Sequence, residues 1–177
     1  SDVSITDTTA LDLVALTANS LTASAGGALT DSGTLAISGL ADLTGSTITI
    51  NDSFDAGTLT FNSAGAVTIS ENSATGLAGT STALSLDLDS TGAITDDGTA
   101  DVTVTNLADF AGTSVTVDDT MNFGSLTFNS AGAVVVAEDS ATALSGTSTA
   151  LSLDLDSTGA ITDDGTADVT VTNLADF

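Results

Sequence analysis

The chain has 177 residues, enough for one ordinary domain, and it contains no lysine, arginine, histidine or cysteine. Its 24 acidic residues give a formal net charge of −24, which disfavours nucleic acids and anionic membranes as partners because no side chain can neutralise phosphate. The absence of cysteine excludes disulfides and thiolate metal sites. Since 41% of the residues are hydrophobic, the chain still has apolar surface to bury and is not expected to be disordered.

Three segments, taken in chain order, alternate apolar and polar residues with a period of two: STITIN (46–51), ALSLDLDS (83–90) and ADVTVTN (100–106). This alternation is typical of half-buried β-strands. Thr, Val and Ile are frequent, and strong helix formers are almost missing. We therefore predict an all-β fold. The residues expected to face its core are Ile48, Ile50, Leu84, Leu86, Leu88, Val102 and Val104, with the six phenylalanines as core fillers at the corners.

The sequence repeats itself with a period of 67 residues. LTFNSAGAV (59–67) recurs at 126–134, and residues 79–110 recur without any change at 146–177. A degenerate copy, GALTDSGTLAISGLADLTG (27–45), comes before them. The repeats are 1–43 (degenerate), 44–110 and 111–177, with no linker between them. Residues 1–177 are thus predicted to form one continuous segment of a longer or polymeric protein. The first residues, SDVSITDTT, show no signal peptide pattern, and no apolar run is long enough to span a membrane.

Two all-β architectures compete. A β-sandwich would need a compact, non-repeating core, and it usually contains some Pro, Trp or Tyr, which are absent here. A right-handed parallel β-solenoid, or β-helix, explains the repetition better, because each coil stacks its inward side chains on those of the next coil. Gly-containing turns divide the chain into about eight coils, three per 67-residue repeat: 1–26, 27–45, 46–65, 66–91, 92–112, 113–132, 133–158 and 159–177. At a rise of ~4.8 Å per coil, the rod would be roughly 40 Å long.

The segments GAITDDGTADVTVTNLADFAG and SLTFNSAGAV resemble the strand repeats of large secreted bacterial surface proteins, namely the filamentous-haemagglutinin-like exoproteins and autotransporter-type β-helices. The resemblance covers essentially the whole chain and lies in its Gly-Ala-Ile-Thr turns, Asn-Ser-Ala-Gly corners and Thr/Val strands. It implies an extracellular, elongated stalk or adhesin. It assigns no functional residue, because the repeat region of that family is a scaffold. The complete absence of lysine and arginine is more extreme than in a typical member, and also fits a surface-layer or filament protein of a salty habitat.

Catalysis is not predicted. Nucleophile activation and electrophilic stabilisation usually require His, Cys, Lys, Arg or Tyr, all of which are missing. A polysaccharide-acting β-helix enzyme would need a groove lined by acids and aromatics, and the only aromatic residues are six phenylalanines. We expect no required cofactor.

Calcium is the ligand that the acidic residues suggest most directly. The stretch DLDSTGAITDDG (87–98) recurs at 154–165 and begins like an EF-hand loop. The Glu at its twelfth position is missing, however, so the simpler interpretation is that these acids are outward strand and turn residues. The candidate ligands in the two copies are Asp87, Asp89, Asp154 and Asp156.

A second set of candidates comes from aligning the coils. The residue after each opening strand is predicted to lie in an outward column, in which two pairs of acids are neighbours: Asp52 with Glu71, and Asp119 with Glu138. Two stacked carboxylates ~5 Å apart would repel each other. A bound cation, protonation or a turn into solvent would each relieve that repulsion.

Three functions therefore remain after the sequence alone. The leading one is a non-catalytic, rigid, acidic extracellular rod, stalk or adhesive filament at the bacterial cell surface. Its partners would be neighbouring coils or identical subunits end to end, and a cationic or carbohydrate surface. The alternative is a calcium-binding surface-layer or adhesion module, in which cations bridge the acid columns. The polysaccharide-acting enzyme is the third and is disfavoured.

Overall fold

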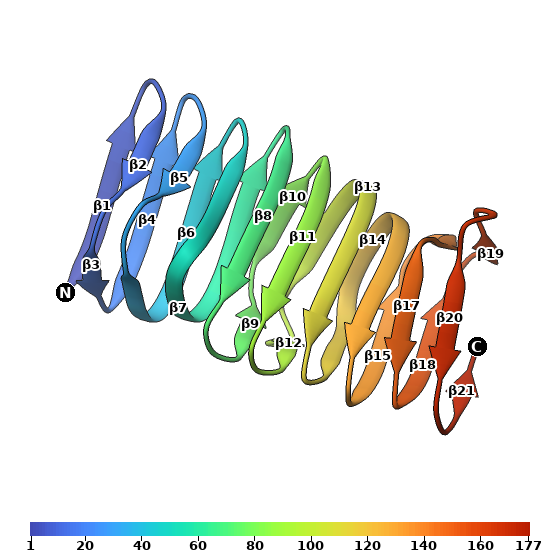
Figure 1. Ribbon diagram of the computed structural model, residues 1–177. Coiled ribbons are helices and arrows are strands. Elements are labelled where there is room, and N and C mark those ends of the chain that lie inside the picture. Colours follow the sequence, from blue (N-terminus) through green and yellow to red (C-terminus); the bar gives the residue numbers. More distant parts are fainter.

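The computed structural model describes all residues, 1–177, and the chain forms strands and turns only. Its turns are stacked side by side along one axis, with the two termini at opposite ends (Figure 1). The strands are β1 (Asp2–Asp7), β2 (Leu11–Leu13), β3 (Leu16–Ala18), β4 (Ser20–Ala25), β5 (Leu29–Asp31), β6 (Leu35–Gly45), β7 (Ile48–Ser63), β8 (Ala66–Glu71), β9 (Thr75–Leu77), β10 (Thr80–Ala83), β11 (Ser85–Ser90), β12 (Ile94–Asp96), β13 (Asp101–Gly112), β14 (Val115–Ser130), β15 (Ala133–Glu138), β16 (Thr142–Leu144), β17 (Thr147–Ala150), β18 (Ser152–Ser157), β19 (Ile161–Asp163), β20 (Asp168–Val171) and β21 (Ala175–Asp176).

Every strand pairing is parallel, and each strand lies against the strand one turn further along the chain. The register shows the turn length, since Leu11 pairs with Leu29 and Leu29 pairs with Ile48. The same inward column continues as Ile48, Val67, Leu86, Ala108, Leu126 and Leu144. The fold is therefore the parallel β-solenoid that the alternation and the repeat predict, with about nine turns where the sequence predicts about eight.

Each turn has two sides of different construction. One is a long side, a straight run of about six strand residues such as β1 or β4. The other is a split side, two short strands separated by a bend, such as β2 and β3. Long and split sides alternate along the chain except at two places, where one long side follows another directly: 58–63 then 66–71, and 125–130 then 133–138. We call these places slip corners, and both carry the motif Asn-Ser-Ala-Gly.

The slip corners explain the difference in turn number. Between one slip corner and the next the chain makes seven sides, 66–71, 75–83, 85–90, 94–104, 107–112, 115–123 and 125–130, which is three and a half turns per repeat instead of three. The predicted coils of 20 and 21 residues hold two sides each, but the 26-residue piece 133–158 holds three, β15, β16–β17 and β18. The half turn is contained in that piece.

Equivalent strands of successive repeats consequently lie on opposite sides of the rod. Leu86 belongs to the column that begins at Leu11. Its copy in the next repeat, Leu153, pairs instead with Val134 and Ala175 on the other side. The 32-residue segment covers parts of both sides of the rod in each of its two copies, and the side on which each of its strands lies is exchanged between the copies.

A single hydrophobic cluster of 40 buried residues runs through the rod. Five of the six phenylalanines belong to it, as predicted, and the rings of Phe110 and Phe123 lie 5.6 Å apart between centroids. Two expectations are wrong. Leu84 is 42% exposed because it lies at the bend before β11, and Phe177 is 65% exposed because no further turn covers it. No helix in the structure is long and apolar enough to cross a membrane.

Candidate functional site

Two buried glutamates, Glu71 and Glu138, are the most unusual polar groups in the rod, with exposed fractions of 1% and 2%. Each ends the long strand that follows a slip corner, β8 or β15. There a straight long side is stacked on a split side, and the register shifts: the five residues from Ile50 to Phe54 lie opposite the three from Ile69 to Glu71. The split side bulges outward at this point and then continues beyond the end of the long strand.

The long strand ends at Glu71, so the rest of that split side has no strand to pair with. The Glu71 side chain takes the place of that strand as hydrogen-bond acceptor. Its Oε1 accepts hydrogen bonds from the backbone N–H of Ala56 and from the Ser73 hydroxyl, both at 3.0 Å, and its Oε2 accepts one from the Thr75 hydroxyl at 2.9 Å. Burial raises the pKa of Glu71 above its ordinary value, and the nearby Asp55 adds to this, while the three hydrogen bonds oppose it. The carboxylate is thus a structural acceptor inside the core.

Glu138 occupies the same position one repeat later. The backbone N–H of Phe123 and the hydroxyls of Ser140 and Thr142 donate to it. Both slip corners are therefore completed by the same buried group.

On the opposite side of each slip corner, a buried serine hydroxyl accepts a hydrogen bond from a backbone N–H group, as the glutamate carboxylate does. There a split side is stacked on a long side, and the backbone N–H of Phe61 donates to the Ser81 hydroxyl at 3.1 Å. In the next repeat Phe128 donates to Ser148 at 3.2 Å. Neither serine is predicted from the sequence, although each stands two residues before a buried alanine and thus in an inward position of its strand.

These positions correct the predicted outward acid pairs. Glu71 lies opposite Phe54 and Glu138 lies opposite Met121, both inside the rod. Asp52 and Asp119 lie in the outward bulges of the split sides, so neither is stacked on its expected partner. Val67, Ile69 and Glu71 continue one alternation, but Ile48, Ile50 and Asp52 do so too, so the sequence does not tell the buried acid from the exposed one.

A different group of acids does come together on the outside. One oxygen from each of Asp96, Asp118 and Asp119 lies within 4.8 Å of the others. The Asp96 carboxylate accepts hydrogen bonds from the backbone N–H groups of Asp118 and Asp119, at 2.6 and 3.2 Å. Carboxylate oxygens are the ligands that calcium prefers, but here one carboxylate already serves the bulge of the next turn.

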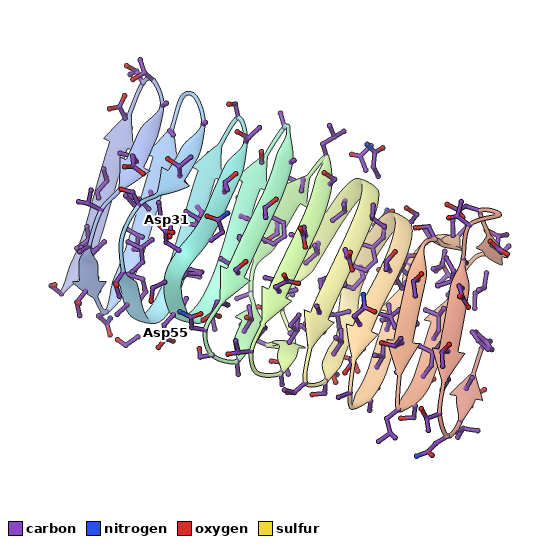
Figure 2. All side chains as sticks on the ribbon, in the orientation of Figure 1. Asp31 and Asp55 are labelled. Carbon is purple, nitrogen blue, oxygen red and sulfur yellow. The ribbon has the colours of Figure 1, made fainter.

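Asp31 of β5 has the same role in the first repeat, on the outside of the rod near its N-terminal end (Figure 2). It accepts hydrogen bonds from the backbone N–H groups of Asn51 and Asp52. Partial burial raises the pKa of Asp31, with a smaller contribution from the charge of Asp52, while its hydrogen bonds oppose the shift. This second example favours a structural role for the aspartate at this position.

The candidate ligands Asp87 and Asp89 lie on β11, pointing away from the core. Asp87 is opposite Asp109 of β13 in the parallel register. Burial, and then repulsion from neighbouring aspartates, raises the pKa of both Asp87 and Asp109. The Oδ1 atom of Asp109 is buried and has no hydrogen-bond partner. In the second copy Asp154 and Asp156 lie on β18, where Asp154 is opposite the exposed Asp176.

We expect Asp109→Asn to stabilise the protein at neutral pH by on the order of 1 kcal/mol, because it removes a partly buried charge that faces Asp87 and Asp89. An acid whose pKa is raised by folding holds more protons in the folded state than in the unfolded state. The free energy of unfolding is therefore undiminished below the ordinary pKa of the acid, and it decreases as the pH rises through the pKa of the folded state. The substitution should therefore raise the melting temperature at pH 7 and leave it almost unchanged at pH 3. Asp176→Asn, in the same local sequence but exposed, is the matched control. Equal shifts for the two variants would contradict the prediction.

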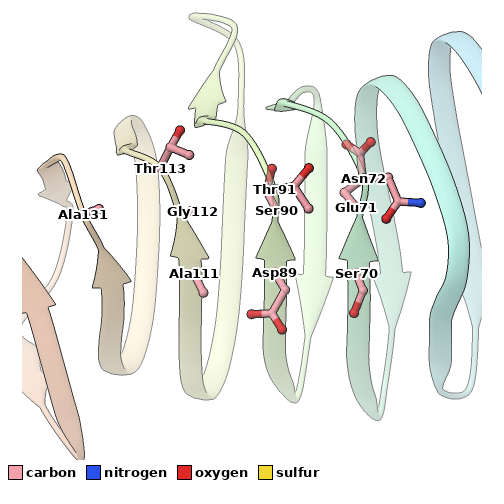
Figure 3. Close-up of a pocket in the computed structure, with 10 residues that line it drawn as sticks. All are labelled: Ser70, Glu71, Asn72, Asp89, Ser90, Thr91, Ala111, Gly112, Thr113 and Ala131. Carbon is pink, nitrogen blue, oxygen red and sulfur yellow. The ribbon is translucent and has the colours of Figure 1, made fainter.

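A groove of about 470 Å³ crosses the corners at the ends of β8, β11, β13 and β14 (Figure 3). Its lining residues are Ser70, Glu71, Asn72, Asp89, Ser90, Thr91, Ala111, Gly112, Thr113 and Ala131. Most of them offer hydroxyl or small side chains, and Asp89 contributes an exposed carboxylate. The groove therefore presents hydrogen-bonding groups and one negative charge across four successive turns.

The registers, the continuous core and the recurring slip corners define the chain as a repeat protein of the β-solenoid class. Residues 1–62 match the family model described as repeats of unknown function (DUF5649). Neither a curated protein nor a solved structure matches the chain.

Proposed function

We propose that the chain is a non-catalytic structural rod, an acidic extracellular spacer, stalk or adhesive filament at the bacterial cell surface. The observation that carries the proposal is the single core of 40 buried residues running through all the turns, because a continuous core holds the two ends at a fixed distance. The likeness of the strand repeats to filamentous-haemagglutinin-like and autotransporter-type exoproteins supports the location. The net charge of −24 keeps such rods apart and soluble.

The location is tested on intact cells of the source organism with an antibody raised against this chain. Labelling of unpermeabilised cells, lost after brief treatment with an external protease, is the expected result. Labelling that appears only after permeabilisation would overturn the extracellular part of the proposal. An antibody against a cytoplasmic protein serves as the control for cell integrity.

The second candidate is a calcium-binding surface module, and the approach of Asp96, Asp118 and Asp119 within 4.8 Å favours it. If cations stabilise the fold there, millimolar calcium raises the melting temperature relative to a chelator at matched ionic strength. Asp118→Asn should abolish that rise, because Asp118 is exposed and only its backbone N–H takes part in a hydrogen bond of the bulge. A melting temperature that does not respond to calcium removes this candidate and leaves the structural rod.

A further inference from the structure

The Ser73 hydroxyl lies between two acids at the first slip corner. Its oxygen is 3.0 Å from Oε1 of the buried Glu71 and 2.8 Å from Oδ1 of Asp55, an exposed residue of β7. A serine hydroxyl has one proton, so it can donate to one of these two oxygens at a time. If both acids are ionised, the other contact therefore brings two oxygens together with no proton between them.

One additional proton would satisfy every contact of this group. A protonated carboxyl group has one O–H donor and can still accept hydrogen bonds. With the proton on its Oε1, Glu71 donates to the Ser73 oxygen, and Ser73 in turn donates to Asp55. The same Oε1 still accepts from the backbone N–H of Ala56, and Oε2 still accepts from the Thr75 hydroxyl.

The electrostatic surroundings of Glu71 also favour protonation, because the chain has no lysine, arginine or histidine to hold the carboxylate in its charged form. The acids on the two strands paired with β8 are Asp52 and Asp55 of β7 and Asp87 and Asp89 of β11. Burial, with the charge of Asp55 adding to it, raises the pKa of Glu71. Since Glu71 lines the groove across the ends of β8, β11, β13 and β14 (Figure 3), it can exchange a proton with water.

The second slip corner has the same geometry without the second acid, because Asn122 stands one repeat after Asp55. The Ser140 oxygen is 3.2 Å from Oδ1 of Asn122 and 3.2 Å from Oε1 of Glu138. An amide offers N–H groups as well as an oxygen. Turning the amide over lets Asn122 donate to Ser140 and leaves the serine proton for Glu138. This corner therefore needs no additional proton.

We propose that the first slip corner is a proton-binding site, in which Glu71 holds a proton and donates it to Ser73 while Ser73 donates to Asp55, and that the second slip corner is not. The proton comes from water, and no bond between heavy atoms forms or breaks. The unfolded chain lacks the site, so its contribution to the free energy of unfolding is full below the ordinary pKa of a glutamate and decreases as the pH rises through the pKa of the folded state. Acidification from neutral pH should therefore stabilise the first corner relative to the second.

The test follows the two glutamates of the full chain by NMR. Glu71 and Glu138 are the only glutamates in the sequence, so cell-free synthesis with ¹³C-labelled glutamate gives two side-chain carboxyl signals, which Glu138→Gln assigns. The pH at the midpoint of each titration is measured for the unmodified chain and for Asp55→Asn, Asn122→Asp and Asp52→Asn. All three positions are exposed, and circular dichroism verifies that each variant keeps its β-structure.

Asp55→Asn should move the Glu71 midpoint to lower pH by about one unit or more, because it removes the negative charge beyond the Ser73 hydroxyl. Asn122→Asp should move the Glu138 midpoint to higher pH by a similar amount, because it rebuilds the same group at the second corner. The control Asp52→Asn changes an acid that forms no hydrogen bond with Ser73, and it should move the Glu71 midpoint much less. An unchanged Glu71 midpoint in Asp55→Asn, an equal shift in Asp52→Asn, or an unchanged Glu138 midpoint in Asn122→Asp would overturn the proposal.

Discussion

Replacing Glu71 by alanine is expected to destabilise the rod by about 3 kcal/mol or more, because the substitution leaves two buried donors, the Ala56 N–H and the Thr75 hydroxyl, without an acceptor, whereas the Ser73 hydroxyl keeps its bond to Asp55. The backbone N–H of Ala56 and the hydroxyls of Ser73 and Thr75 all donate to this carboxylate. A buried donor that loses its partner costs about 1–3 kcal/mol. The cost should appear as a lower midpoint of urea unfolding, monitored by circular dichroism.

Two further variants separate the possible causes. Glu71→Gln keeps an oxygen that can accept from Ala56 and offers an amide to Thr75, so we expect it to cost less than about 1 kcal/mol at pH 7. Asp52→Ala changes the acid that the sequence places next to Glu71 but that the structure places in the outward bulge, and it should stay within about 0.5 kcal/mol of the parent. Equal losses for Glu71→Ala and Asp52→Ala would show that the two carboxylates act as a pair and would contradict the buried-acceptor role.

A substitution at the second slip corner, Gly132→Ala, is expected to cost about 2–3 kcal/mol. A Cβ atom at this position would lie 2.4 Å from the carbonyl oxygen of Thr113, and both atoms belong to the backbone framework of stacked turns, so neither can move alone. Gly65 at the first slip corner is in the same situation, with the Ser46 carbonyl oxygen at 2.4 Å. The tight approach explains why a glycine completes the Asn-Ser-Ala-Gly corner.

The chain itself supplies the control for this prediction. Gly76 lies one repeat before Ala143, so the following repeat already carries alanine at this position. The nearest atoms to a Cβ at Gly76 are 3.3 Å away, which a small adjustment accommodates. Gly76→Ala should therefore leave the urea midpoint almost unchanged. A loss at Gly76 as large as the loss at Gly132 would mean that glycine is needed for backbone freedom in general and not for the close approach at the corner.

The comparison of Asp52 with Glu71 shows how far the sequence could predict the candidate sites. Both acids follow an alternating pair of branched residues, Ile48 and Ile50 in one case and Val67 and Ile69 in the other. The local patterns are the same, yet Asp52 is exposed and Glu71 is buried. The first strand bends outward because it belongs to a split side, and the second continues straight because it follows a slip corner. Nothing within either segment distinguishes the two.

The sequence by itself determined the period, the strands and the way in which they stack. An alternation of two residues requires strands with one buried face, and near-identical segments without linkers require turns that bury that face against their own copies. The tertiary structure decided that a repeat makes three and a half turns, that equivalent strands of identical segments lie on opposite sides of the rod, and that Glu71, Glu138, Ser81 and Ser148 lie inside it. The physical reason is that a backbone group finds its hydrogen-bond partner in the side stacked one turn away. Whether that side is long or split depends on the number of corners that the chain passes on the way around.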